Sequence, residues 1–107
     1  MDDGSSDTYF QVEVDTASAP TLVTASGELD AASSTELGRA LDAALGAGTG
    51  VTLDLAAVTF IDSSALRVVT LSVRRARDES QPFTVTAASD AVRRIFEITG
   101  VSSLLAP

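Results

Sequence analysis

Three segments of the chain alternate apolar and polar residues with the two-residue period of a half-buried strand. They cover residues 9–14, 51–55 and 83–87, and a shorter segment at 21–26 follows the same pattern through Leu22 and Val23. Only a turn-like stretch, 15–20, separates the first two strands. We expect these two to pair antiparallel, because a parallel crossover needs a dozen residues or more.

Three further segments have the period of a helix that is apolar on one side. The first begins near Ser33, which with Glu36 predicts a capping box, and ends at glycines 46, 48 and 50. The second begins at Asp62 or Ser63 and fades over 77–80. The third begins at Ser89 or Asp90 and is expected to end at Gly100. Inward positions are predicted at Leu37, Ala40, Leu41, Ala44, Leu45, Val92, Ile95 and Phe96, with Val101, Leu104 and Leu105 docking at the edge of the core.

The predicted order is strand, strand, helix, strand, helix, strand, helix, which is typical of an α/β domain with a mixed sheet of about four strands. The strands alternate instead of being apolar throughout, so we expect the helices mainly on one face. The other face would carry Glu13, Thr52, Asp54, Thr84 and Thr86. Residues 1–8 are polar and acidic and predict a flexible tail before a single domain over 9–107.

Composition narrows the function classes. The chain has 107 residues, a net charge of -8 and no cysteine. Such a surface repels a nucleic-acid backbone over most of its area. No apolar run approaches the roughly 18 residues of a membrane span. We therefore expect a cytoplasmic protein without direct nucleic-acid contact or membrane insertion.

Catalytic groups are sparse as well. With no histidine, cysteine or lysine, Ser63 lacks the usual general base of a nucleophilic serine. Asp30, Asp54 and Asp62 could gather at strand ends, but they match no known metal-binding loop. The glycines at 46–50 precede a strand, which is the wrong side for a phosphate-binding loop. We expect a non-enzyme that has no metal or other cofactor.

Asp62, Ser63 and Ser64 stand where the central strand gives way to the second helix. The first turn of a helix has unpaired N–H groups and the positive end of the helix dipole, so a phosphoserine there would be tolerated. The simpler alternative is that Asp62 or Ser63 only caps the helix.

Helical spacing assigns Ala65, Leu66, Val69, Ser72, Val73 and Ala76 to the inward side of the second helix. The opposite side gathers Ser64, Arg67, Val68, Leu71, Arg74 and Arg75, with Ser63 at its edge. Such a surface is either ordinary exterior or a small contact patch, and both interpretations stay open.

Three motifs resemble the bacterial anti-sigma factor antagonists built on the STAS domain: GELD at 27–30, DLAAVTFIDSSALRVV at 54–69, and SDAVRRIFEITGV at 89–101. The resemblance covers about 9–105. It implies that the unmodified protein binds an anti-sigma factor that is also a serine kinase. The anti-sigma factor would then exchange partners and release the sigma factor for transcription, as part of a stress response. Phosphorylation of Ser63 would end binding, and a phosphatase would restore it.

The same resemblance places Asp30, Asp62, Ser63 and Ser64 at the partner contact, and we add Arg67, Val68 and Leu71 from the outward side. Ala65 departs from the family, which usually has glycine there, and its methyl group could meet a partner backbone. STAS domains also serve as accessory subunits of membrane transporter ATPases, without phosphorylation. A third alternative is a nucleotide or small-molecule binder at the strand ends near Asp30 and Asp62.

Overall fold

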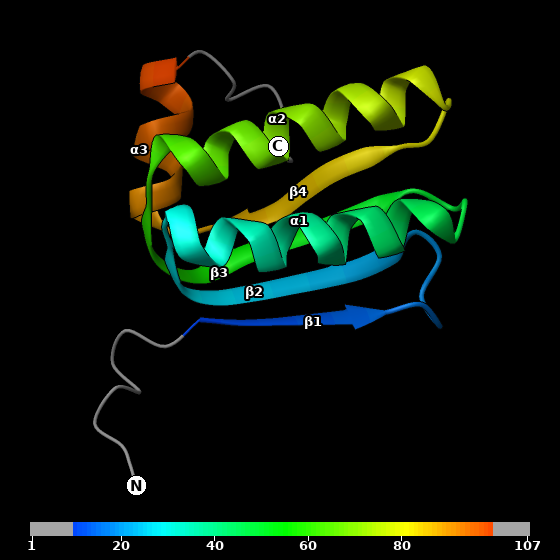
Figure 1. Ribbon diagram of the computed structural model, residues 1–107, viewed down its shortest axis with the longest axis horizontal. Helices are drawn as coiled ribbons and strands as arrows, with labels where there is room; N and C mark the ends of the chain where they lie inside the picture. Colours follow the sequence, from blue (N-terminus) through cyan, green and yellow to red (C-terminus); the bar gives the residue numbers. More distant parts are fainter. Residues whose placement is uncertain (1–9, 100–107) are drawn as a thin grey trace, which may run out of the picture.

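The computed structural model describes residues 10–99, and in that range the elements follow the predicted order (Figure 1). They are β1 (Gln11–Asp15), β2 (Thr21–Leu29), α1 (Ala31–Gly46), β3 (Val51–Ile61), α2 (Ser63–Asp78), β4 (Phe83–Ala88) and α3 (Asp90–Thr99). The predictions for the tail at 1–8, for Gly100 and for Val101, Leu104 and Leu105 fall outside the described residues.

The strands form one mixed sheet in the order β1-β2-β3-β4. β1 pairs antiparallel with β2, as the short connection predicted, while β2–β3 and β3–β4 pair in parallel. The two parallel crossovers pass through α1 and α2. This topology places β3 and its C-terminal end in the interior of the sheet.

Two strands are longer than their alternation predicted. The strand predicted over 21–26 continues as β2 to Leu29, through most of the GELD motif. The strand predicted over 51–55 continues as β3 to Ile61. Register shifts at Thr24/Ser26 and Gly27/Glu28 interrupt the β2–β3 ladder and hide the period of two, after which pairing resumes. The last pair of the ladder joins Leu29 to Ile61, so both strands end at the same level.

α1 and α2 lie side by side on one face of the sheet (Figure 1). The predicted stripe of α1 is buried against β2 and α2, and Val92 and Phe96 of α3 are fully buried near β3 and β4. Glu13, Thr84 and Thr86 are exposed on the opposite face, where Thr52 and Asp54 are half-buried. The expected one-sided arrangement of α1 and α2 is therefore confirmed.

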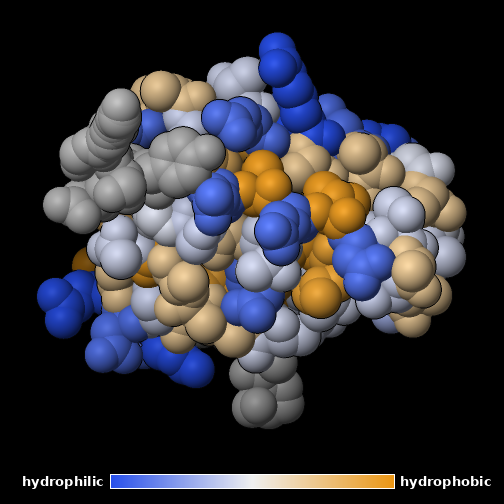
Figure 2. All heavy atoms as spheres, turned by 90° about the horizontal axis from the view of Figure 1, so that it is seen from below, coloured by the Kyte–Doolittle hydropathy of each residue, from blue (hydrophilic) through white to orange (hydrophobic). Residues whose placement is uncertain are grey.

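β1 is the edge strand, and the view from its side shows apolar side chains exposed between hydrophilic ones (Figure 2). Val14 shares the apolar face of the strand predicted over residues 9–14, yet it is 37% exposed. An edge strand is covered from one side only, so alternation overestimates how deeply its apolar residues are buried.

A hydrogen-bonded junction joins the end of α1 to the starts of three strands. Gly50 N–H donates to Gln81 Oε1 at 3.0 Å, and Gln81 Nε2 donates to the carbonyl of Leu45 at 3.0 Å. Thr21 N–H donates to the Gly50 carbonyl at 3.0 Å, and Val51 N–H donates to the Pro82 carbonyl at 2.9 Å. The starts of β2, β3 and β4 are thus aligned at one end of the sheet, and the N-termini of α1 and α2 lie at the opposite end.

Within residues 10–99, no helix combines the length and the apolar character that a membrane crossing requires.

Candidate functional site

The ends of β2 and β3 bring two helix N-termini together. Leu29 pairs with Ile61, and Asp62 N–H donates to the Leu29 carbonyl at 3.0 Å. Asp30 and Asp62 each follow the last residue of a strand, and each is the N-cap of the next helix. The positive ends of the α1 and α2 dipoles therefore lie next to each other at the C-terminal ends of β2 and β3.

Asp30 caps α1 through a reciprocal pair of hydrogen bonds with Ser33. Its Oδ1 accepts from Ser33 N–H at 2.9 Å, while Asp30 N–H donates to Ser33 Oγ at 2.9 Å. The predicted capping box of Ser33 and Glu36 is wrong by one turn, because the helix begins at Ala31 and places Ser33 at its third position. The backbone and hydroxyl hydrogen bonds from Ser33 lower the pKa of the Asp30 carboxyl below its ordinary value.

Asp62 rather than Ser63 caps α2. Asp62 Oδ1 accepts from Ala65 N–H at 3.1 Å, and Ser63 is the first residue of the helix. The Ser63 side chain is exposed, and its hydroxyl forms no hydrogen bond within residues 10–99. Ser64 is half-buried beside it. The capping interpretation therefore holds for Asp62 and leaves the Ser63 hydroxyl accessible.

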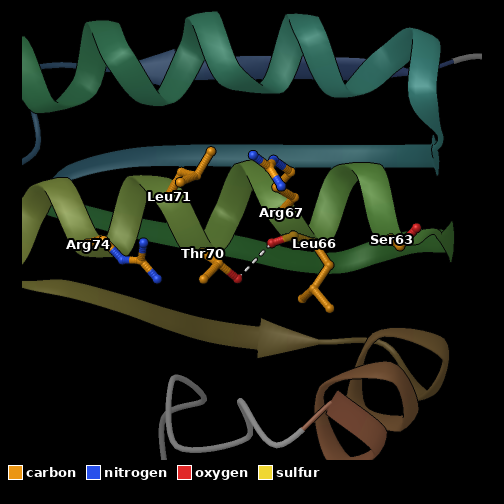
Figure 3. Close-up of a pocket in the computed structure, with 6 residues that line it drawn as sticks. All are labelled: Ser63, Leu66, Arg67, Thr70, Leu71 and Arg74. Atoms are coloured by element: carbon orange, nitrogen blue, oxygen red, sulfur yellow. Dashed lines mark hydrogen bonds between the residues drawn. The ribbon is translucent and has the colours of Figure 1, made fainter.

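A shallow depression of about 330 Å³ follows Ser63 along the outer side of α2. It is lined by Ser63, Leu66, Arg67, Thr70, Leu71 and Arg74 (Figure 3). Leu71 is 47% exposed and lies between two exposed arginines, Arg67 and Arg74. The depression thus offers an apolar floor with cationic groups at its rim.

Two expectations about the helix face need correction. Val68 was assigned to the outward contact patch, but it is half-buried and packs toward α1, where its Cγ1 lies close to Gly38. The methyl group of Ala65 could have met a partner backbone in place of the family glycine, but the residue is fully buried, as its inward assignment predicted. The methyl group in place of the usual glycine hydrogen therefore contributes to the core and leaves the outer surface unchanged.

The structure adds three residues that the site prediction missed, Leu66, Thr70 and Arg74. Leu66 was assigned inward and is indeed buried, at 9% exposure, and it also lines the depression. Thr70 Oγ1 donates to the Leu66 carbonyl at 2.9 Å, which satisfies its hydroxyl inside the helix. The arginine spacing at 67 and 74, two turns apart, was the signal that could have extended the site.

The carboxylates do not converge into a metal site. Asp54 lies eight residues before Asp62 along β3, roughly 25 Å away at the rise of a strand, and it accepts from Ala56 N–H at 3.0 Å. Among residues 10–99, no group of three or more potential ligands is placed to hold a metal ion. Further along α2, Arg75 binds Glu79 at 2.9 Å and Asp42 at 3.2 Å, and the hydrogen bond to Glu79 is the main cause of its raised pKa.

Comparison with known proteins places this geometry in a family. A family described as "Mlab, STAS domain" matches residues 12–106. An anti-sigma factor antagonist from Mycobacterium paratuberculosis is 26% identical, with a TM-score of 0.82 over 94% of this chain and 87% of that chain. No curated protein matches.

Two solved structures of the antagonist SpoIIAA share the fold at lower identity. The unphosphorylated form is 21% identical, with a TM-score of 0.75 over 92% of this chain and 86% of that chain. The phosphorylated form, from Bacillus, is 19% identical, with a TM-score of 0.70 over 92% and 89%. With the family match over nearly the whole chain, and with the fold of the anti-sigma factor antagonists, the chain belongs to the STAS domain family.

Proposed function

We propose that this STAS domain is an anti-sigma factor antagonist whose binding is switched by phosphorylation of Ser63. The unmodified protein binds an anti-sigma factor that is also a serine kinase, and so releases the sigma factor for transcription. Phosphorylation ends this binding, and a phosphoserine phosphatase restores it. The observation that carries the proposal is the exposed Ser63 hydroxyl in the first turn of α2, which Asp62 leaves unused by capping the helix itself.

The similar structures support this assignment by their own descriptions. Each of the three is described as an anti-sigma factor antagonist or as SpoIIAA, and SpoIIAA is described in both unphosphorylated and phosphorylated forms. The present chain has the same fold and carries a serine at the start of α2. A regulatory phosphate at Ser63 fits the local physical chemistry.

The phosphate is expected to leave the fold intact. It adds about -1.5 to -2 charges at a helix N-terminus, where an anion is stabilised by about 0.3–1 kcal/mol. The inhibitory effect therefore lies at the interface, through repulsion from acidic groups of the partner or desolvation of the phosphate.

The proposed contact surface extends from the two helix N-termini along the outer side of α2. It contains Asp30, Asp62, Ser63, Ser64, Arg67 and Leu71, together with Arg74. Arginine is one of the residue types enriched at interface hot spots, and Leu71, which is 47% exposed, adds apolar contact area between Arg67 and Arg74.

The first experiment is intact-mass analysis of the protein recovered from its own host, grown with and without stress, with fragmentation to locate any phosphate. We expect a phosphate at Ser63 whose level changes with growth condition. In vitro, the cognate kinase should modify the wild type and Ser64→Ala but not Ser63→Ala. Ser64→Ala is the matched control, because it removes the neighbouring hydroxyl of the same helix turn.

The proposal fails if the host protein carries no phosphate under any condition and instead copurifies with a membrane transporter ATPase. That outcome would indicate an accessory subunit in which Ser63 is only the first residue of a helix. A large fall in melting temperature on phosphorylation, with partner affinity unchanged, would contradict the proposed interface mechanism.

A further inference from the structure

Arg67 lies one helical turn after Ser63 and lines the same depression (Figure 3). Residues four apart in a helix have Cβ atoms about 5–6 Å from each other, which is within reach of a guanidinium and a phosphate. Both side chains are exposed, so neither has to break a packed contact in order to meet the other. An acidic group that precedes a basic one by four residues is also the more favourable order for a helical ion pair.

The other cations near the depression are less well placed. Arg74 follows Ser63 by eleven residues, about 16 Å along the helix axis. Arg75 is already bound to Glu79 and Asp42. The two carboxylates close to Ser63, Asp30 and Asp62, are both engaged as N-caps by backbone N–H groups. Acidic caps cannot bind a phosphate, so of the cations that line the depression with Ser63, Arg67 is the one within reach of a phosphate there.

We propose that Arg67 binds the phosphate on Ser63, and that this intrahelical pair carries the effect of phosphorylation into the partner surface. The pair draws the guanidinium from the rim of the depression beside Leu71 toward the start of α2. A partner acid that had bound Arg67 then loses its cation in addition to meeting the phosphate. This inference rests on the proposed phosphorylation of Ser63 and specifies how it acts.

The test uses protein with phosphoserine incorporated genetically at position 63, so it does not depend on the host kinase. The second pKa of the phosphate, ordinarily about 6, is followed by phosphorus NMR in the wild type, Arg67→Gln and Arg74→Gln. Loss of the pair is expected to raise that pKa by at least about 0.3 unit in Arg67→Gln. Arg74→Gln is the matched control, since it removes the same charge from the same depression without reaching the phosphate.

A second readout is the Nε–H resonance of each arginine. Phosphorylation should shift the signal of Arg67 and leave that of Arg74 in place. Equal phosphate pKa values in the two arginine variants, or an unmoved Arg67 signal, would overturn the inference. Either result is independent of the mass analysis, in which absence of phosphate from the host protein would instead refute the proposed function.

The coupling to binding is measured with the cognate anti-sigma factor. In the wild type, phosphorylation weakens binding through both the phosphate and the withdrawal of Arg67. The ratio of phosphorylated to unmodified Kd should therefore be smaller in Arg67→Gln than in the wild type or Arg74→Gln. An equal ratio in all three proteins would show that the pair does not transmit the switch.

Discussion

Alanine substitutions at three glycines test the junction that aligns the strands. Gly46, Gly48 and Gly50 lie within five residues between α1 and β3, but they differ in what an added Cβ would meet. At Gly46 nothing lies within 4 Å. Gly48 also has open space, but its φ of +82° strains any other residue. Gly50 has a φ of +95°, and a Cβ there would lie 2.6 Å from the Pro82 carbonyl oxygen.

These differences predict a graded series in the free energy of unfolding. Gly46→Ala should raise it by up to about 1 kcal/mol, because alanine favours the end of α1. Gly48→Ala should lower it by about 1–2 kcal/mol through backbone strain alone. Gly50→Ala carries the same strain and also displaces Pro82, whose carbonyl accepts from Val51 N–H at 2.9 Å. With one or two hydrogen bonds weakened at about 1 kcal/mol each, added to strain of about 1–2 kcal/mol, we expect a total loss of about 2–4 kcal/mol.

Urea unfolding followed by circular dichroism measures the series. At an m-value of about 1–3 kcal/mol/M, Gly50→Ala should lower the midpoint by at least about 0.7 M. Gly48→Ala is the matched control for strain without contact. If both variants lose the same stability, the close approach of Gly50 to Pro82 does not contribute, and the reasoning from contact distance is refuted.

Three further predictions concern single polar groups. Thr21→Val should raise the free energy of unfolding by about 1 kcal/mol, because the buried Thr21 hydroxyl has no hydrogen-bond partner in the described part of the chain; a loss measured in urea would contradict this. Asp62→Ala should lower it by about 1 kcal/mol through loss of the helix cap, whereas Ser63→Ala, at the adjacent exposed position, should change it by less than half as much. The lowered pKa of Asp30 means that its ionised form stabilises the native state, so the stability advantage of the wild type over Asp30→Asn should be full above about pH 4 and should shrink as pH falls through the folded pKa; a difference that stays constant from pH 7 to pH 3 would refute this.

The order of the elements followed from the sequence because each has a clear period, of two or of 3.6 residues. The ends of β2 and β3 did not follow, since register shifts break the alternation while the backbone remains paired. The site could be predicted only in part for a similar reason. Helical spacing ranks positions by angle but contains no information on the neighbouring helix. Val68 lies close to Gly38 of α1, so a side chain predicted to face outward is half-buried.

The cap of α2 shows a different limit of the sequence. Asp62 and Ser63 are both common N-cap residues, and adjacent candidates cannot be separated by residue type. Hydrogen-bonding geometry separates them, because only Asp62 lies one residue before the helix with its carboxylate on Ala65 N–H. Because Asp62 is the cap, the Ser63 side chain stays exposed outside it.

β3 ends at Ile61 and α2 begins at Ser63, so one residue joins the central strand to the helix. A serine in this position cannot be drawn out as an extended substrate without unwinding the first turn and releasing Asp62 from Leu29. An enzyme that modifies Ser63 must therefore recognise a folded surface instead of a linear sequence. A synthetic peptide with the sequence around Ser63 lacks that surface, so the proposed kinase is expected to modify the folded domain and to leave the peptide unmodified.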